Sequence, residues 1–128
     1  MENNKIYDLN ERLIAFAISI ISLTEKVKRN DAGVYLSSQL LQSGTSPALH
    51  YGEATSAESR KDFIHKLKIL LKELRETNNN LIILERAGLI NDKTIIAACL
   101  KECKELISIF TKSIETAKLN LLKEKIKT

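Results

Sequence analysis

Hydrophobic residues recur along this chain at intervals of three and four positions, which is the spacing of a buried helix face. The pattern first predicts a helix over residues 8–29, with these residues on one face: Leu9, Leu13, Phe16, Ile20 and Val27. A second helix is predicted from Ala32 to about Thr55. Proline lacks an amide donor and clashes with the preceding turn, so we expect this helix to be kinked or broken near Pro47.

The second half of the chain carries two seams with a seven-residue repeat. The third predicted helix begins at Ser59, whose side chain can cap it, and ends at Ala87-Gly88. Its seam comprises Phe63, Leu67, Leu70, Leu74, Thr77, Leu81 and Leu84. The fourth is capped by Asn91 or Asp92, continues past Leu122, and has as its seam Ile96, Leu100, Cys103, Ile107, Phe110, Ile114, Ala117 and Leu121. Four helices with short links predict an all-α, antiparallel up-down four-helix bundle, a single domain over residues 1–128.

The chain has more isoleucine than one inward face per helix needs. The residues that exceed this need are Ile14, Ile18, Ile64, Ile69 and Ile83. Excess apolar surface on a helical bundle indicates a partner helix or a second copy of the chain, so we expect a homo-oligomer. The alternative is that thick helices pack a wider core.

The net charge and the lack of targeting patterns indicate which partners and which cellular compartment to expect. The formal net charge of +4 permits contact with nucleic acid, and it is equally typical of a solvated surface rich in lysine. No apolar run reaches the ~18 residues of a membrane-spanning helix, and the polar start lacks the pattern of a signal peptide. We therefore expect a cytoplasmic protein without membrane contact, in which Cys99 and Cys103 stay reduced as small apolar groups.

No motif for catalysis or cofactor binding is present. The chain has no phosphate-binding or dinucleotide-binding glycine loop, no nucleophile elbow and no paired-histidine zinc motif. We expect no enzymatic activity, no cofactor, no metal and no small-molecule substrate. Ser46 lies four positions before His50, but nothing supplies an orienting group and an oxyanion hole for a serine nucleophile.

A polar cluster at the turn between the second and third helices has two interpretations. It comprises His50, Glu53, Asp62 and His65. The favoured interpretation is a polar turn whose side chains cap the helices and bond one another. The other is a metal or acid–base site built around Glu53, Asp62 and His65.

The third predicted helix carries a basic stripe. By helical spacing Lys61, Lys68, Lys72 and Arg75 share one face, and Arg60 adjoins it. Such a stripe is a candidate contact for nucleic-acid phosphates. The alternative is a solvated face with acid–base pairs such as Lys72–Glu76. Few aromatic residues are present for base stacking, so readout of single strands is poorly supported.

Two central segments, residues 39–54 and 57–67, resemble the four-helix-bundle proteins related to those encoded in 23S rRNA intervening sequences. The motif residues, whose role the resemblance does not assign, include Ser46, Tyr51, Glu53, Asp62 and His65. The resemblance implies a ring-shaped homopentamer with no established enzymatic activity. The family often has Arg where this chain has Gln42, and Asn where it has His50. If that arginine binds phosphate, its replacement weakens nucleic-acid binding in this chain. If it pairs with a carboxylate such as Glu53, the loss is structural.

A more distant resemblance is to the accessory protein of diversity-generating retroelements, a basic pentamer that engages a reverse transcriptase and nucleic acid. It extends the expectation to contact with RNA or DNA. Our first hypothesis is a non-enzymatic homo-oligomer that serves as a scaffold or nucleic-acid-binding accessory. The second is a protein–protein adaptor that binds no nucleic acid.

Overall fold

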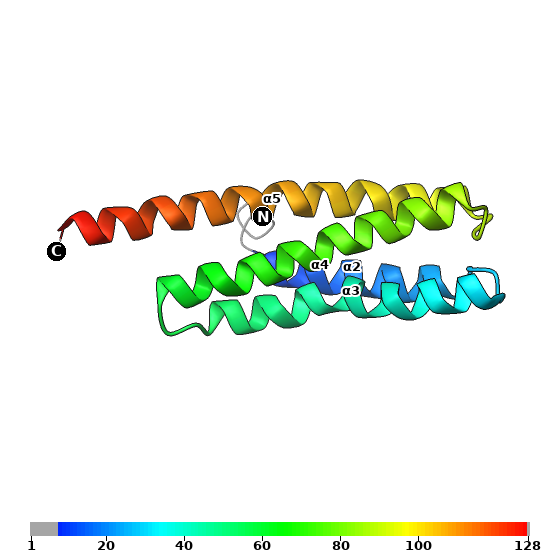
Figure 1. Cartoon of the computed structure of the whole chain (residues 1–128), viewed down its shortest axis with the longest axis horizontal. Helices are drawn as coiled ribbons and strands as arrows, with labels where there is room; N and C mark the ends of the chain where they lie inside the picture. The colour runs from blue at the N-terminus through cyan, green and yellow to red at the C-terminus, as the bar shows by residue number, and fades with distance from the viewer. Residues whose placement is uncertain (1–7, 128) are drawn as a thin grey trace.

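The computed structural model describes residues 8–127, and within them the chain forms four helices and no strand (Figure 1). These are α2 (Leu9–Thr24), α3 (Asp31–Thr55), α4 (Arg60–Arg86) and α5 (Lys93–Lys127). Consecutive helices run in opposite directions, and α3 packs on α2 and α4, α4 also on α5. The all-helical class is confirmed. The single domain predicted over residues 1–128 stays a prediction, and its residues 1–7 and 128 lie outside the described part.

The core lies along the seam of α4, as predicted. Six of its seven seam positions are buried, and Phe63 at the start is half-buried: the buried ones are Leu67, Leu70, Leu74, Thr77, Leu81 and Leu84. In α5 the buried face is turned relative to the predicted seam, because Cys99 and Leu106 are buried where Leu100 and Ile107 were expected. This rotation brings Cys99 toward α2, which contacts the first part of α5.

A capping side chain stands at the start of each of the four helices, and at α2 it is Asp8, which accepts the Glu11 amide at 3.3 Å. The Ser59 hydroxyl accepts the Asp62 amide at 3.0 Å at the start of α4, and Asn30 accepts the Gly33 amide at 2.8 Å at the start of α3. Asp92 likewise accepts the amide of Ile95 at 3.1 Å, so Asp92 caps α5. After α4, Gly88 adopts a left-handed conformation with φ +68°, which ends the helix as the sequence predicted.

The first helix ends earlier than predicted, at Thr24 rather than Arg29. The Thr24 hydroxyl donates to the carbonyl oxygen of Ile21 at 2.7 Å, a local bond that competes with the next helical turn. Val27 instead forms an isolated antiparallel bridge with Ile90. Its apolar side chain is therefore buried by pairing between two loops, which helical periodicity could not distinguish from a longer helix.

Pro47 lies inside a continuous α3, so the predicted break is wrong. Proline offers no amide to the carbonyl four residues earlier, which belongs to Ser43. Contacts with the rest of the bundle hold this stretch in the helix: Pro47 is buried, and the Thr77 hydroxyl of α4 donates to the buried Ser43 side-chain hydroxyl at 2.9 Å. A kink in the helix axis at this position stays a prediction.

The five isoleucines counted as surplus divide into three groups. Ile14, Ile18 and Ile83 are exposed, as self-association requires. Ile64 is 6% exposed and belongs to the core, as the alternative of a wider core expects. Ile69 is half-buried. The exposed set on α2 also includes Ile21, which shares one side of that helix with Ile14 and Ile18.

Gly44 lets α2 and α3 approach closely. A Cβ atom built at this position would lie 2.8 Å from Cγ2 of Ile20 and 2.9 Å from its Cγ1. Ile20 is fully buried in the core, so its branched side chain has no free space to move into. The spacing of the first two helices therefore depends on the missing side chain at Gly44.

We expect Gly44→Ala to lower the free energy of unfolding by about 1–3 kcal/mol, the usual cost of overpacking a core. Gly52→Ala is the matched control, because a Cβ there would meet nothing within 4 Å in the same helix. That control should raise stability by about 0.5–1 kcal/mol, since alanine is the better helix former. Urea unfolding followed by circular dichroism measures both. Equal effects of the two substitutions would contradict the close approach.

Candidate nucleic-acid interface

The outer face of α4 presents a row of cations. Lys61, Lys68, Lys72 and Arg75 are all exposed, because the buried seam of this helix points the opposite way. They span fourteen residues of helix, which is about 21 Å at 1.5 Å per residue. That length matches about six steps of a nucleic-acid duplex. The fold thus exposes the predicted basic stripe to solvent.

These four cations form no ion pair with any other residue in the range 8–127. The Lys72–Glu76 pair, the sequence-based alternative, does not form. Around Leu71 the side chains border a shallow hollow whose lining comes entirely from α4 and includes three cations, Lys68, Lys72 and Arg75, together with Glu76. An anion at this surface would meet the three cations without breaking an ion pair, beside one carboxylate.

Arg60, the fifth residue of the predicted stripe, has a different environment. Its Nε donates to Oε1 of Glu124 at 2.7 Å, which ties the start of α4 to the far end of α5. Lys112 lines the same α4–α5 hollow as Arg60 and Phe63. Arg60 is therefore a structural link between two helices in addition to any contact with phosphate.

The polar cluster at the α3–α4 turn is only partly assembled. Glu53 lies 3.3 Å from Lys66 Nζ and 3.5 Å from Nδ1 of His50, the latter without hydrogen-bond geometry. The amide of Asp62 is bound by the cap residue of α4, and His65 is exposed. The structure therefore joins Glu53 to His50 and Lys66, and it leaves Asp62 and His65 outside that group.

Two further motif residues have structural contacts. The Ser46 hydroxyl donates to the carbonyl oxygen of Gln42 at 2.6 Å, within its own helix. The Tyr51 ring meets Phe110 of α5 edge to face, with ring centroids 5.7 Å apart. Burial raises the pKa of the Tyr51 hydroxyl. Tyr51 thus helps hold α3 against α5, and Ser46 is used by its own backbone.

A line of buried polar residues between α3 and α4 was missed by sequence reasoning. Asn80 donates to the carbonyl oxygen of Leu36 at 3.0 Å, and Thr77 donates to Ser43 one turn further along. Burial raises the pKa of the nearby Glu73 carboxyl and Glu76 raises it further, whereas the charges of His50 and Lys72 lower it. A polar Thr77 inside an otherwise apolar seam was the signal in the sequence. These bonds fix the register of α3 against α4.

The two cysteines are free and buried. Burial raises the pKa of the Cys103 thiol to about 12, with Cys99 and Glu102 adding to the rise. Its Sγ also donates to the carbonyl oxygen of Leu74 at 3.2 Å. Because only the thiolate is nucleophilic, these groups pack the core and have no chemical reactivity at neutral pH.

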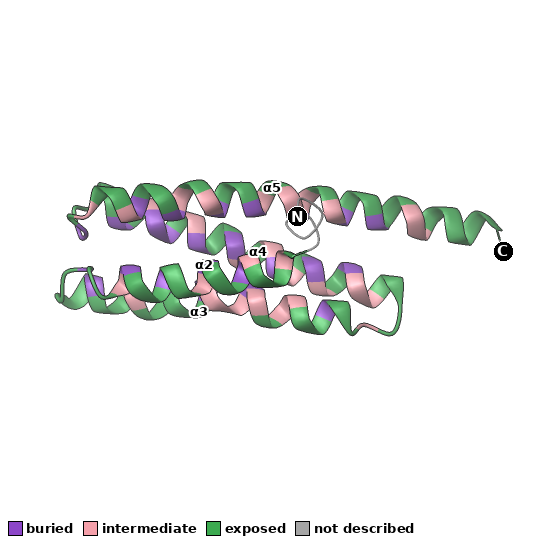
Figure 2. Ribbon diagram, turned by 180° about the vertical axis from the view of Figure 1, so that it is seen from behind, coloured by how far each residue is buried: buried purple, intermediate pink, exposed green. Residues whose placement is uncertain are grey.

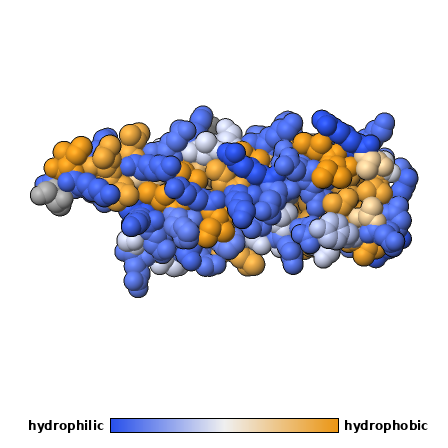
Figure 3. All heavy atoms as spheres, viewed as in Figure 1, coloured by the Kyte–Doolittle hydropathy of each residue, from blue (hydrophilic) through white to orange (hydrophobic). Residues whose placement is uncertain are grey.

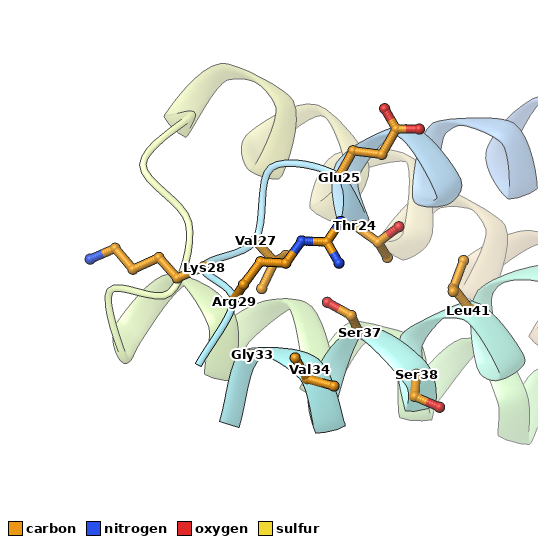
Figure 4. Close-up of a pocket in the computed structure, with 10 residues that line it drawn as sticks. All are labelled: Thr24, Glu25, Val27, Lys28, Arg29, Gly33, Val34, Ser37, Ser38 and Leu41. Atoms are coloured by element: carbon orange, nitrogen blue, oxygen red, sulfur yellow. The ribbon is translucent and has the colours of Figure 1, made fainter. Parts of the chain in front are cut away.

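A hollow that was not predicted from the sequence lies at the connection between α2 and α3 (Figure 4). Ser37, Ser38 and Leu41 of α3 form one wall, and Figure 4 shows Arg29 extending across it while Lys28 points away.

Among residues 8–127, no group of three or more His, Cys, Asp and Glu side chains is placed to hold a metal ion. None of the described helices has the length and apolar character needed to cross a membrane.

Comparison with known proteins identifies the class. The family of 23S rRNA-intervening sequence proteins matches residues 5–112, so the chain belongs to that family. It is also similar to a crystal structure from Bacteroides thetaiotaomicron, described as a protein with unknown function from the S23 ribosomal protein family. That likeness has 31% identity and a TM-score of 0.75, and it covers 82% of this chain and 96% of the other. No curated protein matches the chain.

We expect neither thiol to react with an aromatic disulfide reagent in the folded protein at pH 8. Burial shields both side chains and raises the pKa of both thiols, so little reactive thiolate is present at this pH. Release of the coloured thiolate measures the rate, and protein in denaturant should release two equivalents at once. Fast reaction of the native protein would contradict the packing around α5.

Proposed function

We propose that this chain is a non-enzymatic, self-associating helical bundle of the cytoplasm that binds RNA or DNA as an accessory or scaffold. The observation that carries the proposal is the row of exposed, unpaired cations on α4, namely Lys61, Lys68, Lys72 and Arg75. Cations on a rigid helix attract phosphates through the release of counterions, without reading base sequence. Binding would be sensitive to salt and tolerant of sequence.

Self-association is supported by apolar side chains that the single chain leaves exposed. On α2 these are Ile14, Ile18 and Ile21, which lie on one side of the helix. In a closed ring, every subunit would present its α4 stripe in an equivalent position, so weak phosphate contacts would add. The five-fold ring is implied by the family resemblance, and we propose the same subunit number here.

A protein–protein adaptor is the second candidate. It is favoured by Tyr35 and Leu49, which are 63% and 70% exposed on α3, outside the basic face. Aromatic and aliphatic side chains at such positions are the usual anchors of protein interfaces. An adaptor of this kind would bind a protein partner and would show no affinity for nucleic acid.

Reversal of charge on α4 tests nucleic-acid binding. We expect the Lys68→Glu, Lys72→Glu double variant to weaken binding of structured RNA and duplex DNA, and to reduce the log–log salt slope by about 1 for each lysine. Fluorescence anisotropy of labelled nucleic acid, titrated from low to physiological salt, gives both quantities. Lys101→Glu with Lys104→Glu on α5 is the matched control for net charge, since both lysines are exposed.

Two results would decide between the candidates. Equal losses in the α4 and α5 variants would mean that only net charge matters and that α4 is not the interface. No binding by the wild-type protein at low salt would remove the nucleic-acid role and leave the protein adaptor.

The mass of the wild-type particle tests self-association independently of any ligand. We expect light scattering to give a multiple of the 14.4 kDa chain mass, five-fold if the ring is a pentamer. The exposed isoleucines of α2 supply the driving force, so the mass should persist at high salt. A particle of 14.4 kDa over the micromolar range would exclude the ring.

A further inference from the structure

Helix α5 projects past the other three helices at its C-terminal end (Figure 1). The Arg60–Glu124 ion pair marks where α4 begins beside it. Over this end, Leu119, Leu122 and Ile126 are 58%, 55% and 76% exposed. Figures 2 and 3 show the same end as a solvent-exposed helix on which apolar atoms gather. The spacing of three and four residues places these side chains on one side, the pattern of a helix that docks into a groove.

A groove of suitable chemistry lies at the other half of the molecule, between α2 and the first part of α5. Its lining is mostly small or apolar and includes Ala15, Ile18, Ser22 and Ala98, with a volume of about 440 Å³. Small side chains on both walls leave room for the backbone of another helix. Ala15 to Ser22 spans seven residues, about 10 Å, and Leu119 to Ile126 spans the same length.

The charges around the two surfaces are opposite. On α2, Glu11 and Glu25 stand at the ends of the stripe that contains Ala15, Ile18 and Ser22. On α5, Glu102 and Glu105 follow Ala98 along the second wall, and Arg12 pairs with both of them. Lys101 also follows Ala98 by one turn, so four acidic residues face two basic residues at this groove and the groove is acidic on balance.

The projecting end of α5 is basic. Lys118 flanks its apolar side chains on one side, and Lys123 and Lys127 flank them on the other. A helix docked by Leu119, Leu122 and Ile126 would bring lysines to both rims of an acidic groove. These opposite charges favour docking of the end of α5 in the α2–α5 groove.

We propose that the projecting end of α5 of one chain docks into the α2–α5 groove of a second copy. The projecting end leaves its own bundle in Figure 1, at the opposite half from its own groove, so the contact must join two chains. Each chain then donates one helix end and accepts another, a head-to-tail contact that closes into a ring when the rotation between subunits allows it. This inference rests on the self-association proposed above and identifies the surfaces that carry it.

Two double variants test the donating helix end and the accepting groove independently. Leu122→Gln with Ile126→Gln removes the apolar contact from the donating helix, and glutamine keeps its helix propensity. Ala15→Gln with Ala98→Gln fills the accepting groove from both walls. All four positions are exposed, so each variant should keep the helical circular dichroism and cooperative melting of the wild type. Val34→Gln on α3, 56% exposed, is the control for loss of surface apolarity.

We expect light scattering to give 14.4 kDa for each double variant alone and an unchanged assembly for Val34→Gln. An equimolar mixture of the two double variants should give twice the chain mass, because one intact helix end then meets one intact groove. If the wild type assembles while either double variant keeps the wild-type mass, or the mixture stays at 14.4 kDa, this pairing is wrong and self-association stands. A wild type of 14.4 kDa would instead remove self-association itself.

Discussion

Burial of the seven-residue seam of α4 is the interaction on which the rest of the structure depends. This helix contacts both α3 and α5, and its leucines from Leu67 to Leu84 form the centre of the core. Each buried leucine of the seam stabilises the fold by about 1.5–3 kcal/mol relative to an exposed one. Because a helix has two opposite sides, fixing the seam inward also fixes Lys61, Lys68, Lys72 and Arg75 outward on solvent.

Small and polar residues determine how closely α3 packs on α2 and in which register it packs on α4. Gly44 lets α3 lie close to Ile20 of α2, and the Thr77–Ser43 hydrogen bond holds α3 in register with α4. The same packing supports Pro47 inside a continuous helix, where an isolated helix would be expected to break. Specificity within the bundle therefore comes from a few positions, whereas its stability comes from the repeated leucines.

The sequence was sufficient to predict the four helices, the caps of α4 and α5 and the outward basic stripe, because these depend on local residue types and periodicity. It failed where distant segments meet. Val27 continues the apolar pattern of α2 but is buried by Ile90 across two loops, and Ile64 turned out to be core. The pairing of Glu53 with Lys66 and the engagement of Arg60 by Glu124 also depend on the placement of whole helices. Spacing along one helix carries no information about such contacts.

The central claim is that the outer face of α4 is where this family member meets phosphates. Lysine acetylation, followed by mass spectrometry with and without structured RNA, tests it most directly. Our account predicts that RNA slows modification of Lys61, Lys68 and Lys72 and leaves Lys101 and Lys104 unchanged, since all five are exposed in the protein alone. Equal rates with and without bound RNA at the three α4 lysines would contradict the account, and protection elsewhere would place the interface on another face.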